Sequence, residues 1–377
     1  MIHTALITSE VSIDVYDKFR NLDDTIYMSD SKKYLNSRYR ENGINIIGYY
    51  IFKPKFQTYI IAIKINFKKL INENYDKTDL LKQKDIENTD IELSFNNIIQ
   101  ELNIGLPLYE NWKVNRIDYC VNINTPYVKE YINILHKSDM PYNLTYGAGE
   151  NRNYSKRKDS FYLVKKQNHK KKFTQNVRIN FYNKQEQLKN AQKKGVQVTD
   201  EQIAAAKNIL RLEVQCFKSK TEYLKTKYSM TTKNLSYFLN AEISHDVILN
   251  ALSKIVRVGN YRRKSKAIEL ISKRNGHNST NDILKQIVND VAVQHSAVYK
   301  VREKYILKGM KKETFNNCLK LLDKINVNPV TIPDNLKLEG KRYDEGLTDL
   351  ITLFEQAFLE SYYDRKIEVD IVEDEVK

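Results

Sequence analysis

Alternating apolar and polar positions dominate the first part of the chain. Up to about Phe217, apolar and β-branched residues recur with a period of two, which is typical of a strand with one buried face. Helical spacing is confined to short stretches near 97–102, 127–136 and 200–209, the last preceded by Thr199 in a capping arrangement with Gln202. We therefore expect an α+β fold with an antiparallel central sheet that has one covered face. The predicted strands are His3–Ile13, Ile44–Phe52, Thr58–Phe67, Val114–Ile123, Ser160–Lys165, Val177–Tyr182 and Leu210–Phe217.

The period changes to 3.6 after about Met230. Apolar residues then recur at helical spacing, with Gly and Pro confined to the joints. We expect a sheet domain over 1–230, a helical DNA-binding or accessory domain over 231–365, and an acidic tail over 366–377. The predicted helices are Leu235–Leu239, Val247–Val256, Ala267–Ser272, Ile283–Val291, Ala297–Ile306, Thr314–Ile325 and Leu347–Tyr363.

One pair of these predicted helices has the order of a helix-turn-helix. The stretch near 297–325 combines a short helix, a turn at Gly309 and an amphipathic helix that ends near Ile325. In DNA-binding proteins such a motif places its second helix in the major groove. Two helices that simply pack together across a glycine turn produce the same pattern, so both interpretations stay open.

Three of the predicted strands carry a polar row beside an apolar one. In VRINFYNKQEQL, which starts at Val177, alternation places Arg178, Asn180, Tyr182 and Lys184 on one face. If the three strands are neighbours in the sheet, an acidic group from each of the other two converges on Tyr182. The rows of those two strands are Arg116, Asp118, Cys120 and Asn122 in the first, and Arg211, Glu213 and Gln215 in the second.

Such a set suits transesterification at a phosphodiester. A tyrosine hydroxyl has an ordinary pKa of about 10 and is a poor nucleophile at neutral pH, so it needs activation and in-line placement. Mg²⁺ or Mn²⁺ held by Asp118 and Glu213 would polarise the scissile phosphate. Lys184 would stabilise the attacking tyrosine or neutralise a phosphate oxygen. The alternative is a set of cross-strand ion pairs on an exposed sheet face.

The charge of the chain favours a polyanionic partner. Lys and Arg number 62 against 47 Asp and Glu, which gives a formal charge of +15. AT-rich coding bias also enriches a chain in Lys, Asn, Ile and Tyr. Two basic clusters, 152–158 and 165–172, flank a predicted strand and contain aromatic residues that could stack on unpaired bases; a solvated basic hairpin is the alternative. The candidate DNA contacts are Arg116, Arg178, Arg211, Lys156, Arg157, Lys165, Lys166, Lys170 and Lys171.

Several other classes of protein are not indicated. The three cysteines, Cys120, Cys216 and Cys318, are widely spaced and predict neither a disulfide framework nor a zinc ribbon, which fits a reducing cytoplasm. There is no GxxxxGK[ST] loop for ATP and no HxH or HExxH histidine pair. No apolar run approaches the roughly 20 residues of a membrane span. We expect a cytoplasmic protein without a membrane partner.

The order of short motifs resembles a family of replication proteins. RID at 116–118, then FYNKQEQL at 181–188, then ILRLEVQCFKSKTEYLKTKY at 209–228 is similar to the gene II replication initiators of filamentous phages. The likeness to plasmid rolling-circle initiators of the Rep_trans type is looser. The start MIHTALITSEV and the segment INFKKLINEN look like further family segments, and the resemblance spans about residues 1–230 with a fainter echo in 309–329.

The resemblance implies an enzyme that nicks one strand at a double-strand replication origin. In such enzymes a tyrosine forms a 5′-phosphotyrosine, leaves a 3′-OH primer and later rejoins the displaced strand, with a host helicase as a partner. The family's tyrosine and lysine fall on Tyr182 and Lys184, and its acidic residues fall on Asp118 and Glu213. The implied architecture is that of the HUH endonucleases without the HUH motif.

The resemblance also has departures and rivals. His3 stands where related starts often carry Asp, and it is a candidate third metal ligand on the strand face that includes Ala5. An ordinary N-terminal histidine is the alternative. A noncatalytic protein that binds origin or operator DNA, and a relaxase-like nickase of conjugation, are the other functions that these motifs allow.

Overall fold

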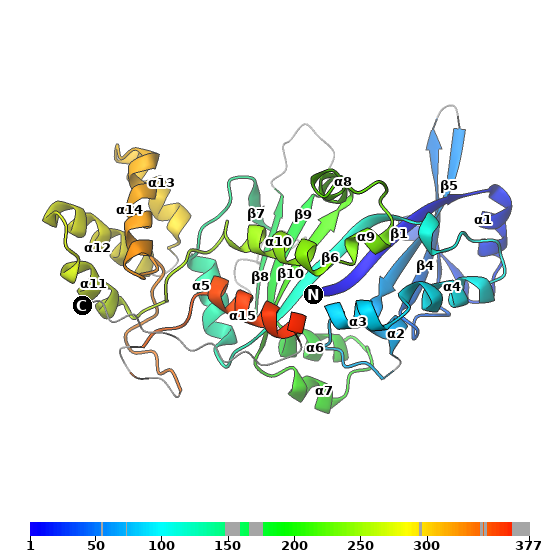
Figure 1. The fold of residues 1–377 in the computed structure, drawn as a ribbon, viewed down its shortest axis with the longest axis horizontal. Coiled ribbons are helices and arrows are strands. Elements are labelled where there is room, and N and C mark those ends of the chain that lie inside the picture. The colour runs from blue at the N-terminus through cyan, green and yellow to red at the C-terminus, as the bar shows by residue number, and fades with distance from the viewer. Residues whose placement is uncertain are drawn as a thin grey trace.

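A long antiparallel sheet runs through the molecule (Figure 1). The computed structural model describes residues 1–53, 56–72, 74–147, 159–165, 176–293, 296–339, 342 and 345–363. Within these residues the sheet has ten strands in the order β2-β3-β4-β5-β1-β6-β10-β9-β8-β7. Every strand pair of this sheet is antiparallel. The predicted α+β class with an antiparallel central sheet is therefore confirmed.

All seven predicted strand segments form strands. The ends differ from the prediction by a few residues at most, because the period-two pattern locates a strand better than its terminal residues. The strands are β1 (Ile2–Val11), β4 (Ile44–Lys53), β5 (Phe56–Asn66), β6 (Lys113–Asn124), β8 (Ser160–Lys165), β9 (Val177–Asn183) and β10 (Ile209–Phe217). Three short strands near the two edges of the sheet were not predicted: β2 (Thr25–Met28), β3 (Lys33–Asn36) and β7 (Leu144–Tyr146).

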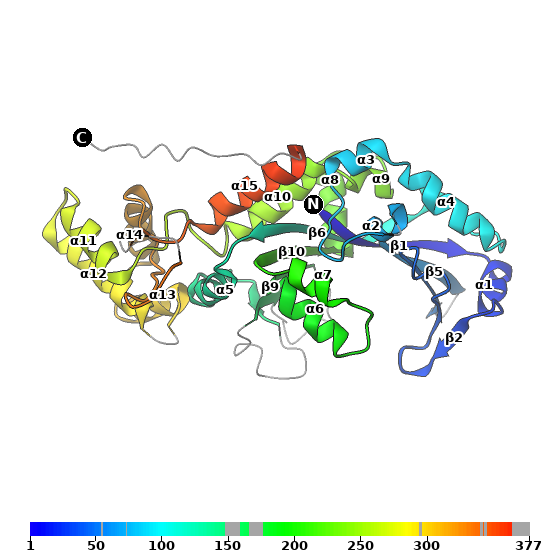
Figure 2. The ribbon, with the colours of Figure 1, turned by 90° about the horizontal axis from the view of Figure 1, so that it is seen from below.

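Helices of the C-terminal half cover the apolar face of the central strands. These are α8 (Lys218–Lys227), α9 (Leu235–Phe238), α10 (Ala241–Leu252) and α15 (Leu350–Tyr363), which lie above the sheet in Figure 2. The hydroxyl of Tyr119 on β6 donates a hydrogen bond of 3.1 Å to the carbonyl of Phe238, and Ser244 on α10 donates to the carbonyl of Met1. One hydrophobic core thus joins residues on both sides of position 230, and the division into domains stays a prediction.

The remaining C-terminal helices form a bundle at one end of the molecule (Figure 1). They are α11 (Lys264–Lys273), α12 (Asn278–Ala292), α13 (Val298–Leu307) and α14 (Lys312–Lys324). The turn between α13 and α14 passes through Gly309, whose φ of +91° lies in the left-handed region. The two helices and the turn near 297–325 are present as expected. That the second helix of this pair binds in the major groove of DNA stays a prediction.

The polar face of the central strands is covered by a small helical insertion between β9 and β10. It consists of α6 (Lys184–Gln192) and α7 (Asp200–Ala205), which lie below the sheet in Figure 2. Thr199 and Gln202 form the predicted capping box at the start of α7, each accepting a backbone hydrogen bond of 3.2 Å from the other. A small separate cluster of Leu188, Val198, Ile203 and Ala206 holds the insertion together.

The other helices connect strands or pack on the core. They are α1 (Ile13–Arg20), α2 (Phe67–Ile71), α3 (Gln83–Asn88), α4 (Ile91–Glu101) and α5 (Val128–Lys137), with single 3₁₀ turns at Ser29–Ser31 and Tyr109–Asn111. The predicted helices at 97–102 and 127–136 correspond to α4, which begins earlier, and α5. No helix in the part of the chain that the structure describes is long and apolar enough to cross a membrane.

Candidate functional site

The three strands with polar rows are neighbours in the order β6-β10-β9. Their register places Arg211 between Asn122 and Tyr182 in one lateral row. In the next row Glu213 lies between Cys120 and Asn180, and in the third Gln215 lies between Asp118 and Arg178. Asp118, Tyr182 and Glu213 therefore occupy one face of adjacent strands, which is the convergence that the alternation pattern required.

Lys184 does not belong to the strand, which corrects the prediction that it shares a strand face with Tyr182. Strand β9 ends at Asn183, whose side-chain oxygen accepts a hydrogen bond of 3.2 Å from the backbone of Glu186 and so caps helix α6. Lys184 is the first residue of that helix. Its side chain is nevertheless buried beside the site, and its Nζ donates a hydrogen bond of 2.9 Å to Gln187.

A bulge in β1 brings His3 to the polar face. Ile2 pairs with Tyr119 and Thr4 pairs with Asp118, so two residues of β1 advance while β6 advances by one. The extra residue is His3, whose Nδ1 lies 3.6 Å from Glu213 Oε2. His3 therefore faces the same side as Thr4, and its expected place on the face of Ala5, which is buried in the core, is wrong.

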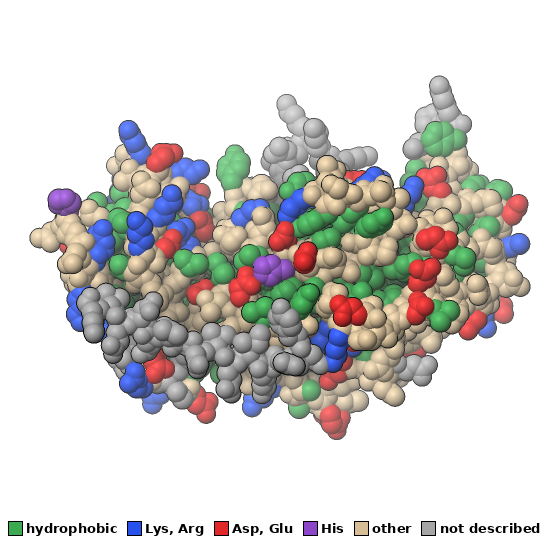
Figure 3. Space-filling view, in the orientation of Figure 1, with side chains coloured by type: hydrophobic (Ala, Val, Ile, Leu, Met, Phe, Trp, Pro, Cys, Tyr) green, Lys and Arg blue, Asp and Glu red, His purple; other side chains and the backbone are tan. Residues whose placement is uncertain are grey.

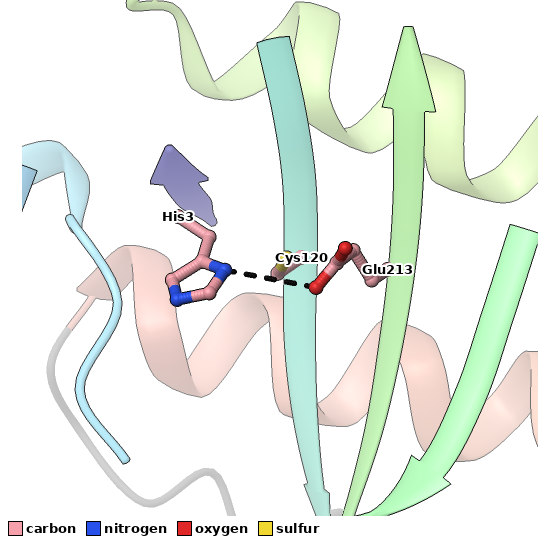
Figure 4. A group of neighbouring side chains, drawn as sticks. All are labelled: His3, Cys120 and Glu213. Atoms are coloured by element: carbon pink, nitrogen blue, oxygen red, sulfur yellow. Dashed lines mark ion pairs between the residues drawn. The ribbon is translucent and has the colours of Figure 1, made fainter. Parts of the chain in front are cut away.

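Glu213 contacts several members of the polar cluster, and Figure 4 shows it facing His3 beside Cys120. Its Oε2 accepts a hydrogen bond of 3.2 Å from the Tyr182 hydroxyl and faces His3, while its Oε1 accepts one of 2.6 Å from Gln215. Burial alone would raise the pKa of Glu213, but the close contact with His3, the hydrogen bond from Gln215 and the charge of Arg211 lower that pKa to about 2. Burial lowers the pKa of His3. At neutral pH the pair is thus a carboxylate and a neutral imidazole.

Asp118 has different neighbours from Glu213. Thr4 donates a hydrogen bond to its Oδ2, and Arg116 Nε lies 3.1 Å from its Oδ1. Burial raises the pKa of Asp118 to about 6 against the opposing effect of Arg116, and the charge of Glu213 adds to the rise. The two carboxyl groups predicted to share a metal ion therefore differ in their contacts and in the ease with which they ionise.

The pKa values of Tyr182 and Lys184 are both shifted from their ordinary values. Tyr182 is 9% exposed, and its pKa is raised well above the ordinary value by burial and by the charge of Glu213. Its phenol is therefore protonated at neutral pH and acts as a hydrogen-bond donor. Burial and the charge of Arg211 lower the pKa of Lys184 to about 7, so this amine can gain or lose a proton near neutrality.

Tyr182 lines two clefts, which also share residues of α6. The larger has a volume of about 980 Å³ and the smaller about 560 Å³, and Tyr182 and Gln187 line both. The charged residues of the larger cleft are five cations and two acidic residues among a mostly uncharged lining, and the smaller cleft has a mixed polar lining. The cationic residues of the larger cleft are Arg40, Lys64, Lys69, Lys77 and Lys184, and those of the smaller are Arg178 and Lys194.

The predicted DNA contacts have different positions. Arg211 is fully buried, donates a hydrogen bond of 2.7 Å to Asn122 and also contacts the carbonyl of Thr78, so we assign it a positioning role in place of the predicted contact with DNA. Arg116 is partly buried, and the guanidinium of Arg178 lies 4.9 Å from the centre of the Phe217 ring. The predicted contacts Lys156, Arg157, Lys166, Lys170 and Lys171, and the side chain of Lys165, lie outside the described residues.

Cys120 completes a group that the sequence prediction did not assign. Single ligand atoms of His3, Cys120 and Glu213 all lie within 4.8 Å of one another (Figure 4). Asp118 is not part of this group, because it lies one lateral row away. Alternation already placed Cys120 on the polar face of its strand, but only the strand register puts it opposite Glu213.

Comparison of the chain with models of protein families, with curated proteins and with solved structures finds no match. The resemblance to gene II initiators and the HUH-like architecture remain predictions, based on the order of three short motifs along the chain.

Proposed function

We propose that this protein is a DNA nicking and joining enzyme that initiates rolling-circle replication. The observation that carries the proposal is the position of Tyr182. Its side chain lines both clefts, and its hydroxyl donates a hydrogen bond to the buried carboxylate of Glu213, with several cations along the larger cleft. A nucleophile that borders both clefts can reach a phosphodiester whose two flanking segments occupy the two clefts.

The proposed chemistry is a reversible transesterification. The oxygen of Tyr182 forms a bond to phosphorus while the bond from phosphorus to the 3′-oxygen breaks, which yields a 5′-phosphotyrosine and a free 3′-OH. The phenolic proton passes to solvent water, because Glu213, with a pKa of about 2, is too weak a base to keep it, and the 3′-oxygen takes up a proton as it leaves. Lys184, whose pKa is about 7, is a suitable donor. Attack by a 3′-OH on the phosphotyrosine runs the same steps backwards and rejoins a strand.

A divalent cation would assist this reaction as a Lewis acid and would lower the pKa of the nucleophile. Glu213 is the residue best placed to hold it, because its carboxylate is ionised and already contacts Tyr182. Asp118 stays the predicted second ligand, with Mg²⁺ or Mn²⁺ as the predicted ion. Its oxygens contact Thr4 and Arg116 and would have to exchange these partners.

The helical bundle is the proposed contact with duplex DNA at the origin. Lys and Arg side chains gather over α11–α14 in Figure 3. In the turn and at the ends of α13 and α14, Lys304, Lys308, Lys311 and Lys312 are exposed. Cations of this kind bind the phosphate backbone without regard to sequence. A host helicase that opens the duplex beyond the nick is the proposed protein partner.

The test is covalent capture of DNA. A pool of random-sequence single-stranded DNA carrying a label at the 3′ end is incubated with the full chain and with Mg²⁺ or Mn²⁺. The proposal predicts a labelled protein band that survives denaturation and a DNA-linked peptide that contains Tyr182. Tyr182→Phe should reduce adduct formation by at least about 10³-fold, since the nucleophile is lost.

Tyr162→Phe is the matched control. Tyr162 lies on β8, opposite Asn180 of β9, and borders the smaller cleft. Its loss should leave the adduct nearly unchanged. An adduct that persists in Tyr182→Phe and disappears in Tyr162→Phe would move the nucleophile to Tyr162 and refute our assignment.

A noncatalytic DNA-binding protein is the second candidate. It is favoured by one observation: the Tyr182 hydroxyl is buried, protonated and satisfied by Glu213, as a structural tyrosine would be. In that case the parent protein retains the labelled pool on a filter under native conditions, and no adduct forms under any ion condition.

A further inference from the structure

We propose that His3, Cys120 and Glu213 form a three-ligand site for a transition-metal ion of the zinc class, which replaces Mg²⁺ or Mn²⁺ as the ion of this cluster. The inference deepens the proposed function, because the ion would lie beside Tyr182, but binding of the ion does not depend on nicking. The site combines one nitrogen, one sulfur and one oxygen donor from three adjacent strands (Figure 4).

The backbone fixes the three donors independently of one another. Cys120 and Glu213 are directly opposite each other in the register of β6 and β10, on the polar face. His3 is the extra residue of the β1 bulge, and the backbone N–H of Cys120 donates a hydrogen bond of 2.9 Å to the carbonyl of Met1, which holds the bulged end against β6. A bulge next to a site commonly serves to aim one side chain.

The separation of the donors is close to what a metal ion needs. Zn–N and Zn–S bonds of about 2.0 and 2.3 Å place neighbouring tetrahedral ligands about 3.5 Å apart. The donor atoms of His3, Cys120 and Glu213 lie within 4.8 Å of one another, and His3 Nδ1 is 3.6 Å from Glu213 Oε2. A shift of about an ångström, within the reach of side-chain torsions, closes the site around an ion.

The chemistry of the donors selects the class of ion. Mg²⁺ prefers an octahedral shell of oxygens, whereas a thiolate and an imidazole suit Zn²⁺ and related ions. On binding, the thiol of Cys120 releases its proton to solvent and becomes the thiolate ligand. Three protein ligands leave one tetrahedral position open, as in catalytic zinc sites. The Tyr182 hydroxyl is 3.2 Å from Glu213 Oε2 and is a candidate for that position.

The neighbouring carboxyl group offers no comparable site. Asp118 contacts Thr4 and the guanidinium of Arg116, and the positive charge of that guanidinium opposes a cation at the same oxygen. The lateral row of Asp118 also contains neither an imidazole nor a thiol, since its other members are Gln215 and Arg178. The row of Asp118 and the row of Cys120 and Glu213 therefore differ in the metal ligands that they can provide.

The experiment uses Co²⁺ as a spectroscopic probe of the metal-free, reduced full chain. A tetrahedral Co²⁺ ion bound by a thiolate gives visible d–d bands and a near-ultraviolet charge-transfer band from sulfur to cobalt. The proposal predicts both bands with one equivalent of Co²⁺, their loss when Zn²⁺ is added, and no loss with a large excess of Mg²⁺.

Three variants assign the ligands. Cys120→Ser should remove the charge-transfer band and weaken Zn²⁺ binding by at least about 100-fold, more than the loss of an outer contact would. Cys216→Ser is the control, because Cys216 is an equally buried free cysteine that is paired with Ile117 on the apolar face; its bands should be unchanged. His3→Ala should keep the charge-transfer band and weaken binding by about 10-fold or more.

The outcomes separate this inference from the proposed function. No charge-transfer band in the parent, or an unchanged band in Cys120→Ser, overturns the metal site, even if a Tyr182 adduct forms with Mg²⁺. The expected bands without any DNA adduct support the metal site and overturn the proposed nicking function. Thermal unfolding of each metal-free variant supplies the check on folding, and His3→Ala decides the question if Cys120→Ser does not fold.

Discussion

Two lateral rows of the sheet lie one residue apart along each strand, so they point to opposite faces. One row is apolar and the other is polar. Phe181, Leu212 and Val121 are paired across β9, β10 and β6 on the apolar face of the sheet, where they belong to the hydrophobic core. The next row on the other face contains Tyr182 and Arg211. Members of both rows are buried, so burial does not distinguish them. They differ in that the apolar row needs only close packing, whereas each polar group needs a specific partner.

This difference predicts that stability and activity can be separated on one strand. Phe181→Ala should cost about 3–5 kcal/mol in the free energy of unfolding, because it leaves a cavity in the core. Tyr182→Phe removes one hydroxyl and should cost about 1 kcal/mol. Urea unfolding of both variants measures these changes in the free energy of unfolding. Adduct formation per folded molecule should persist in the first and vanish in the second; the reverse result would contradict the division between the faces.

Within the polar face, Glu213 is expected to stabilise the fold as an ion. Its pKa of about 2 is below the unfolded value of 4.5, so its contribution is present above pH 4.5 and is lost as the pH falls through about 2. Glu213→Gln should therefore cost about 3 kcal/mol at pH 7 and about 1 kcal/mol at pH 3. Denaturant unfolding of the parent and the variant at the two pH values measures this pH dependence of the free energy of unfolding. A cost independent of pH would show that the carboxylate charge is not involved.

Asp118 should have the opposite effect. Its pKa of about 6 is above the unfolded value of 3.8, so its ionisation destabilises the fold as the pH rises through this range. Asp118→Asn should raise stability by about 2–3 kcal/mol at pH 7 and by less than about 1 kcal/mol at pH 4. The measurement is the same pair of unfolding curves. Loss of stability at pH 7 would mean that the pairing with Arg116 outweighs the cost of burial.

The smallest expected effect concerns the insertion over the polar face. Thr199→Ala removes the cap of α7 and should cost about 1 kcal/mol. Because α6 and α7 share only a small cluster of their own, hydrogen exchange should quicken in 184–206 and not in β10. Thr226→Ala, on the outer helix α8, is the control, since Thr226 is exposed and its hydroxyl donates a hydrogen bond to the carbonyl of Glu222 within the same helix. If Thr226→Ala quickens hydrogen exchange in 184–206 as much as Thr199→Ala does, the insertion is not stabilised separately from the rest of the molecule.

Local pattern was sufficient for much of the fold. The period-two alternation located all seven long strands and assigned Tyr182, Glu213 and Asp118 to polar faces, because a strand determines the direction of each side chain within itself. The capping box of Thr199 and Gln202 could also be predicted from the sequence, since a cap involves only neighbouring residues. The short strands β2, β3 and β7 were missed because three or four residues contain too little alternation.

The sequence alone thus determined the chemistry available on each strand face and the order of the motifs. The tertiary structure alone decided which groups meet: the bulge that turns His3 toward Glu213, the register that sets Cys120 opposite it, and the cap at Asn183 that moves Lys184 onto a helix. The physical reason is that periodicity is a property of one segment. Register and bulges depend on the pairing of segments that are far apart in the chain.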